Sequence, residues 1–207
     1  MRYVPPAVLI GALLSGLFAV LCLALTLGTV ELSMTDLWRT LVGEAQNTPI
    51  DNLRTIVFDI RMPRILLALC IGAILALSGA VMQGLFRNPL ADPSLIGVSS
   101  GASVGASLAI VFAGGLLQAH AWMGLSVVAL GAFAGGLLAT LFVYRLATSE
   151  FGTSVTTMLL AGIAIGAIAG SLNGLLSYFS NDALLRQISI WQMGNLSTAS
   201  WSRLLPV

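Results

Sequence analysis

The chain contains no lysine, a single histidine and two cysteines, and only 8% of its 207 residues are charged. A soluble domain carries roughly a quarter charged residues, so this sequence lacks the polar surface that a water-soluble globule needs. The absence of lysine excludes P-loop and Schiff-base chemistry. One histidine and two cysteines form no cluster of metal ligands, so we expect no metal site on this chain. A net charge of +1 predicts no nucleic-acid partner.

Apolar residues make up 57% of the sequence, and the mean hydropathy is +0.98. A membrane span needs about 20 mostly apolar residues, and uncharged stretches of that length recur along the chain. We therefore expect an all-α, polytopic transmembrane bundle with five complete spans and a sixth that starts near Trp201. The five are expected at about Ala7–Thr29, Ile65–Phe86, Ser94–Leu116, Met123–Tyr144 and Thr153–Phe179.

Several local features accompany these spans. The first run is too long for the apolar core of a signal peptide and lacks a convincing cleavage site, which favours a retained span. The loop after it begins with Ser33-x-x-Asp36, the pattern of a capped interfacial helix. The third and fourth spans are separated by a turn at Leu117–His120. Cys22 and Cys70 lie in apolar runs, so we expect small buried thiols and no disulfide.

Small residues recur every four positions inside the expected helices. Lipid provides little hydrophobic drive for helix association, so helices pack by bringing their backbones close over such small faces. The spacing predicts a tight bundle. The second span carries Gly72, Ala76, Ala80 and Gly84. Helix-packing roles are predicted for Gly97, Gly101, Gly105, Gly162, Gly166, Gly170 and Gly174.

Two polar features lie inside the expected spans, a serine motif and an asparagine. Gly97-Val98-Ser99-Ser100-Gly101 matches the serine-hydrolase pattern G-x-S-x-G, but that motif requires a strand before it and a helix after it. The only histidine, His120, is expected at the far end of a helix roughly 30 Å long, beyond hydrogen-bonding reach of Ser99. A packing face is therefore favoured over a nucleophile. Asn173, in the fifth span, is interpreted as an interhelical hydrogen-bonding residue, with a place on a transport pathway as the alternative.

Five segments, in order along nearly the whole chain, carry a specific resemblance. They are RMPRILLAL over 61–69, ALSGAVMQGLFRNPLADP over 76–93, LIGVSSGA over 95–102, LLAGIA over 159–164 and WQMGNLSTASW over 191–201. Together they resemble the FecCD-type permease subunits of ABC importers for iron–siderophores, heme and vitamin B12. The resemblance implies a multi-pass protein of the bacterial inner membrane with about ten spans. It also implies a transport subunit that is not an enzyme.

The resemblance implies partners as well. Such permeases work as a pair, so a second copy is expected, with the substrate passing between the two. A periplasmic binding protein delivers the ligand, and two ATP-binding subunits drive the cycle. ATP and Mg belong to those subunits, and this chain binds no cofactor.

Roles for individual residues follow from the same resemblance. Arg61 and Arg64 match the periplasmic mouth, where basic groups dock acidic residues of the binding protein; two arginines snorkelling at a helix end are the alternative. Asn88 and Leu90 match the cytoplasmic end of the pathway and are candidate gate residues, with Thr156 and Thr157 as weaker candidates. A plain connecting turn is the alternative for that segment.

The sequence leaves alternatives for the substrate and for whether the chain is a fragment of a longer protein. The Ser180–Gln187 stretch is more similar to heme permeases than to siderophore permeases, with cobalamin as a third possibility. The family's coupling loop and last four spans have no counterpart in these residues, so we expect a fragment or truncated product. The competing class is a small membrane scaffold that does not transport. Charge bias alone favours the inverted topology, with three arginines against six on the expected cytoplasmic and external sides.

Overall fold

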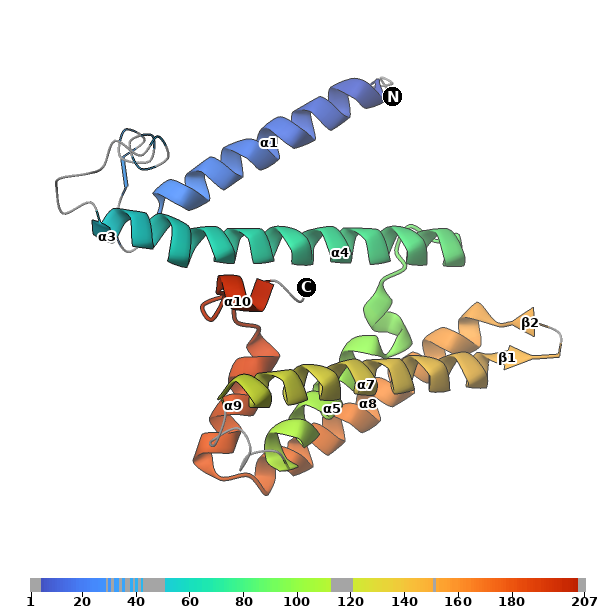
Figure 1. Cartoon of the computed structure of the whole chain (residues 1–207). Coiled ribbons are helices and arrows are strands. Elements are labelled where there is room, and N and C mark those ends of the chain that lie inside the picture. Colours follow the sequence, from blue (N-terminus) through green and yellow to red (C-terminus); the bar gives the residue numbers. More distant parts are fainter. Residues whose placement is uncertain are drawn as a thin grey trace. The chain divides into compact units, whose positions relative to one another are not determined.

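The computed structural model describes residues 5–28, 30, 32–33, 35, 38, 40, 42, 51–112, 121–150 and 152–204. These residues form helices joined by short turns, with one two-stranded hairpin (Figure 1). The contacts group the chain into two units, Met1–Ala73 with Leu196–Val207, and Ile74–Asn195. The boundary between the units falls inside one long helix.

The first unit contains α1 (Pro6–Thr26), α3 (Asp51–Arg54), the π-helix η1 (Thr55–Arg61), the first half of α4 (Met62–Phe86) and α10 (Trp201–Leu204). The second unit contains the rest of α4 and then η2 (Pro93–Ile96), α5 (Val98–Phe112), α7 (Ala121–Ala147), β1 (Thr148–Ser149), β2 (Gly152–Thr153), α8 (Val155–Tyr178) and α9 (Asp182–Met193). The strands pair antiparallel, with Thr148 opposite Thr153.

Four stretches of the described helices are long and apolar enough to cross a membrane: Pro6–Thr26, Thr55–Phe86, Val127–Ala147 and Val155–Tyr178. The expected polytopic helical fold is thereby confirmed. The third expected span differs, because α5 has 15 residues in the part of the chain that the structure describes. The predicted turn at Leu117–His120 lies outside the described residues, as do Asp36 and the end of the chain after Leu204.

Local chemistry explains why α5 begins at Val98 and not at Ser94. Pro93 starts a single turn of 3-10 helix, capped by Asp92, whose side chain accepts a hydrogen bond from the Ser94 backbone N–H. Gly97 then adopts a left-handed conformation at φ 80°, which glycine accepts without steric penalty. The chain therefore changes direction at Gly97 before the longer helix begins.

The second span begins earlier than expected, because η1 runs directly into α4. Proline inside a helix lacks an N–H and crowds the preceding turn, and a wider π turn is one way to accommodate it. Here the Met62 N–H donates to Val57, five residues back, and Pro63 has no N–H to offer Phe58. The indole N–H of Trp201 donates to that Phe58 carbonyl over 2.9 Å. A residue 143 positions away thus provides a donor that the helix lacks.

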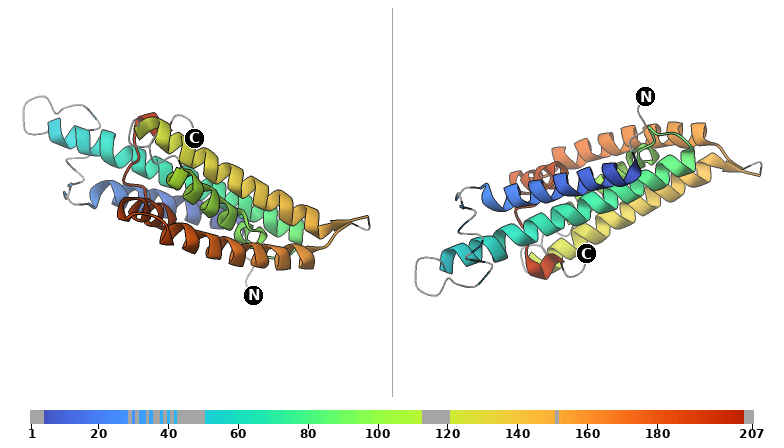
Figure 2. Two further views of the ribbon diagram at one scale, coloured as in Figure 1. Left: turned by 90° about the horizontal axis from the view of Figure 1, so that it is seen from below. Right: turned by 90° about the horizontal axis from the view of Figure 1, so that it is seen from above.

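Helices α5, α7 and α8 run alongside one another in the second unit (Figure 2). Gly101 and Gly105 of α5 face Gly131 and Gly135 of α7, so closely that a Cβ built on Gly131 would lie 2.7 Å from the Gly105 carbonyl oxygen. Real Cβ atoms do not approach an oxygen so closely, so these two backbones can meet only over glycine. The sequence contains the same four-residue spacing on α7, at Gly131 and Gly135, which was not among the predicted packing positions.

Helix α9 was not predicted, because the segment between Ser180 and Ser200 is polar. The Asn181 side chain caps it by accepting from the Leu184 N–H over 3.0 Å, and Asp182 lies in its first turn, where negative charge favours a helix. Its Ile188 is buried against Ala106 and Ile110 of α5 and Val128 of α7. One apolar face on a polar helix thus fixes α9 to the second unit. The thiols of Cys22 and Cys70 are free, as expected, but neither is buried: Cys22 is half-buried and Cys70 is exposed.

Replacing Gly131 with alanine should destabilise the protein by about 1–3 kcal/mol, because the added methyl group would force α5 and α7 apart. Gly84→Ala is the matched control, since its Cβ would meet no described atom within 4 Å and alanine favours a helix. Thermal unfolding of the purified protein in one detergent measures both. Equal midpoints for the two variants would contradict glycine-dependent contact between α5 and α7.

Candidate functional site

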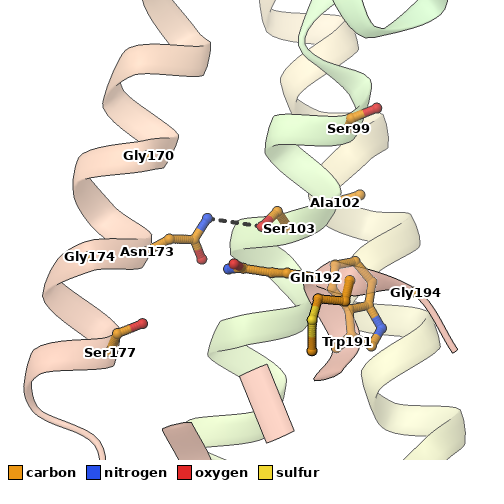
Figure 3. Close-up of a pocket in the computed structure, with 11 residues that line it drawn as sticks. Ser99, Ala102, Ser103, Gly170, Asn173, Gly174, Ser177, Trp191, Gln192 and Gly194 are labelled. Atoms are coloured by element: carbon orange, nitrogen blue, oxygen red, sulfur yellow. Dashed lines mark hydrogen bonds between the residues drawn. The ribbon is translucent and has the colours of Figure 1, made fainter. Parts of the chain in front are cut away.

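A cavity of about 800 Å³ opens in the second unit between α8, α5 and the end of α9. Helix α5 contributes Ser99 and Ser103, one turn apart on the same face. Figure 3 shows the lining from the three helices. The lining consists of Ser99, Ala102, Ser103, Gly170, Asn173, Gly174, Ser177, Trp191, Gln192, Met193 and Gly194.

Asn173 lies at the centre of this lining. Its Nδ2 donates to the Ser103 hydroxyl over 3.0 Å, which joins α8 to α5 by a hydrogen bond between side chains (Figure 3). Its Oδ1 is buried and has no hydrogen-bond partner among the described residues. Asn173 thus makes the interhelical hydrogen bond that the sequence predicted, and its side chain also lines the cavity.

The described cavity lining is polar without being charged. Its functional groups are hydroxyls, two carboxamides and the indole and thioether of Trp191 and Met193. No group of three His, Cys, Asp or Glu side chains able to hold a metal ion occurs among the residues that the structure describes. Ser99 lines this cavity, and His120 lies outside the residues that the structure describes. The arrangement is suited to binding through neutral hydrogen bonds.

The candidate gate residues Asn88 and Leu90 lie in the turn after α4. Asn88 Oδ1 accepts from the Leu90 N–H over 3.0 Å, which closes a local turn around Pro89. The Leu90 side chain is 83% exposed, while the neighbouring Ala91 is buried. Further along, hydrogen bonds from the Ser94 hydroxyl and backbone N–H lower the pKa of Asp92, which therefore stays ionised in this turn.

Thr156 and Thr157 occupy the first turn of α8 and are exposed. The Thr157 N–H donates to the Ser154 hydroxyl oxygen, which caps the helix, and its own hydroxyl donates to the same oxygen over 2.9 Å. Phe86 and Ile96 pack with Met158 and Ala147 in one apolar cluster. That cluster brings both pairs of gate candidates to the same end of the second unit.

Arg61, expected at an exposed mouth, is only 8% exposed. Its guanidinium donates to the carbonyl oxygens of Leu25 and Val30, at and beyond the end of α1. The last carbonyls of a helix have no intrahelical donor, and a cation there is favourable. A Cβ on Gly28 would lie 2.6 Å from Arg61 Nη2, so glycine leaves room for this guanidinium. Arg61 therefore ties α1 to η1.

Arg64 behaves differently from Arg61, although it lies only one turn away. Its side chain is exposed, and Nη2 donates to the Ser197 carbonyl oxygen over 3.5 Å, a long hydrogen bond. Of the two arginines, Arg64 is the one with a guanidinium accessible to a partner.

The glycines of α8 divide into two groups. A Cβ on Gly162 would collide with the Leu95 backbone, and one on Gly166 would lie 3.5 Å from the Ser100 hydroxyl oxygen. A Cβ on Gly170 or Gly174 would meet no described atom within 4 Å, and both residues line the cavity. The first group packs against the η2–α5 segment, and the second leaves the cavity wall flat. The sequence did not point to Ser103 or Gln192 as lining residues, although the four-residue spacing of Ser99, Ser103 and Ser107 was a usable signal.

Comparison with known proteins agrees with this architecture. The family model described as the FecCD transport family matches residues 16–207. The hemin transport system permease protein HmuU of Yersinia pestis is 42% identical over 202 residues, which are 98% of this chain and 57% of the relative. The vitamin B12 import system permease protein BtuC of Salmonella newport is 45% identical over 147 residues, or 71% of this chain and 43% of the relative.

A solved structure described as an inward-facing conformation of a metal-chelate type ABC transporter matches with a TM-score of 0.70 and 34% identity. The match covers 97% of this chain and 57% of the other, so the chain spans about half the length of the relatives it matches. Both the sequence and the fold therefore match the same group of transport permeases, which are not enzymes. The chain belongs to the FecCD transport family of ABC transporter permeases.

Proposed function

We propose that the protein is the membrane-spanning subunit of an ATP-driven importer that carries heme from a periplasmic binding protein to the cytoplasm. The observation that carries this proposal is the neutral, polar cavity between α5, α8 and α9, in a chain that is 42% identical over nearly its whole length to a hemin permease. The proposed location is the bacterial inner membrane. A ferric siderophore or cobalamin is the alternative cargo, since a B12 permease is also similar.

The proposed assembly follows from the family. Two copies of the permease enclose the pathway, and two separate subunits bind ATP and Mg and provide the energy. Asn88, Leu90, Thr156 and Thr157 form the proposed cytoplasmic gate, because one apolar cluster brings both pairs to the same end of the unit. Asn173 belongs to the proposed pathway, because it lines the cavity.

Competition for uptake tests the cargo. In cells carrying the complete transporter, excess hemin should abolish uptake of labelled heme, while excess ferric siderophore or cobalamin should leave it unchanged. A strain lacking the transporter provides the background. Heme would be contradicted as the cargo if excess hemin left uptake of the transporter's native ligand unchanged while excess cobalamin or siderophore inhibited it.

Arg64→Glu should weaken docking of the binding protein about tenfold or more, because charge reversal replaces an attraction with a repulsion at the contact. The salt dependence of the affinity should fall as well, since screened charge pairs carry it. Surface-plasmon measurements on the full permease in nanodiscs give both quantities. Arg87→Glu is the control, because it is exposed at the turn that ends α4, in the proposed cytoplasmic gate region. An affinity of the Arg64 variant that matches wild type at every salt concentration would remove Arg64 from the docking surface.

Asn88→Cys should react with a water-soluble maleimide at a rate that changes between nucleotide-free and ATP-bound transporter. The reason is that a gate residue alternates between open and closed surroundings. The native thiols Cys22 and Cys70 must first be replaced, since both are free. Ser149→Cys, in the exposed hairpin, reports general accessibility. A constant rate at position 88 would identify a connecting turn and not a gate.

A further inference from the structure

The indole of Trp201 attaches the 196–201 segment to the start of the second expected span, within the first unit. Its acceptor, the Phe58 carbonyl oxygen, lies in the π turn before Pro63. The Met62 N–H donates to Val57 instead, and residue 63 has no N–H, so the helix leaves this oxygen to an outside donor. The Trp201 N–H fills that place over 2.9 Å.

The rest of the segment forms a turn that joins Trp201 to Ser197. The Ala199 N–H donates to the Leu196 carbonyl oxygen over 3.1 Å, and Trp201 begins α10 directly after this turn. The indole therefore anchors one end of a short turn, and a displacement of Trp201 would move Ser197 as well.

The Ser197 carbonyl oxygen is the point where this turn meets Arg64. Arg64 Nη2 donates to it over 3.5 Å, a long hydrogen bond that directs the exposed guanidinium. An arginine has five N–H donors and this bond uses one of them, so the same guanidinium can also bind a carboxylate. An arginine side chain loses conformational entropy when it docks, and a guanidinium that is already oriented loses less.

We propose that Trp201 is a positioning residue for docking of the binding protein. Its indole hydrogen bond holds the 196–201 segment where the Ser197 carbonyl oxygen orients the Arg64 guanidinium for a carboxylate of the partner. This inference rests on the proposed docking role of Arg64. The contribution of Trp201 to the docking affinity therefore passes through Arg64 and disappears when the guanidinium is absent.

A double-mutant cycle tests this dependence. Trp201→Phe removes the indole N–H and keeps an aromatic ring, and it should weaken docking to the full permease in nanodiscs about three- to tenfold, as expected for one lost hydrogen bond. The salt dependence of the affinity should stay that of wild type, because no charge changes. Arg64→Ala should weaken docking at least as much. Added to Arg64→Ala, Trp201→Phe should weaken docking by less than about twofold further.

Arg87→Ala is the matched control for the cycle, since Arg87 is exposed at the end of α4 in the second unit. In that background Trp201→Phe should weaken docking as much as it does in wild type. Thermal unfolding in the same nanodiscs establishes that each variant is folded at the temperature of the binding measurement.

Ala199→Pro gives the same comparison without touching the indole. Proline removes the N–H that closes the turn between Ser197 and Trp201. The variant should therefore weaken docking when Arg64 is present and change it by less than about twofold when Arg64 is alanine. If Trp201→Phe does not fold, this variant decides the question.

The outcomes separate this inference from the docking proposal. Equal losses from Trp201→Phe with and without Arg64 would overturn the positioning role, while docking at Arg64 would stand. Unchanged affinity in Trp201→Phe, together with a loss in Arg64→Ala, would overturn it in the same way. Unchanged affinity in Arg64→Ala would overturn the docking role of Arg64 and the inference with it.

Discussion

The close contact of α5 with α7 is the constraint on which the second unit depends. Gly101 and Gly105 meet Gly131 and Gly135 at distances that no side chain permits, so the two backbones lie against each other. In lipid, where burial of apolar surface adds little, such contact supplies the dispersion energy that holds helices together. With one face of α5 fixed in this way, helical geometry directs Ser99 and Ser103 to another face, toward α8 and α9. The cavity and its hydrogen bond to Asn173 therefore follow from glycine packing on the other side of the same helix.

The polar groups of the chain are handled in two ways, according to where they lie. Within α5 and α8 the polar side chains are neutral, which avoids the cost of a charge away from water. At helix ends the polar side chains complete the backbone, whether neutral, as Asn181 is at the start of α9, or charged, as Arg61 is for the carbonyl oxygens at and beyond the end of α1. This division explains why two neighbouring arginines of one motif differ. The Arg61 guanidinium is buried in hydrogen bonds to backbone carbonyl oxygens, whereas Arg64 is exposed.

Prolines determine where the helices begin and how they are joined. Pro63 removes an N–H in the middle of a continuous helix, and a π turn with a distant indole donor accommodates the loss. Pro93 instead begins a separate short turn that ends at left-handed Gly97. The same residue type therefore has opposite consequences, because Trp201 is available to Phe58 whereas the turn at Pro93 is capped locally by Asp92.

The sequence establishes that the chain is an all-helical membrane protein, and its motifs identify the family. Composition suffices for the first, because a helix in lipid must satisfy its own backbone and carry an apolar surface. The sequence also indicated that Asn173 forms a hydrogen bond between helices. The sequence did not predict α9, the π turn at Pro63 or the burial of Arg61. Each of these depends on a residue far away in the chain: the apolar surface of α5 for Ile188, the indole of Trp201 for Phe58, and the end of α1 for Arg61. These features depend on the tertiary structure, because a local sequence pattern shows which groups need a partner and not which distant group provides one.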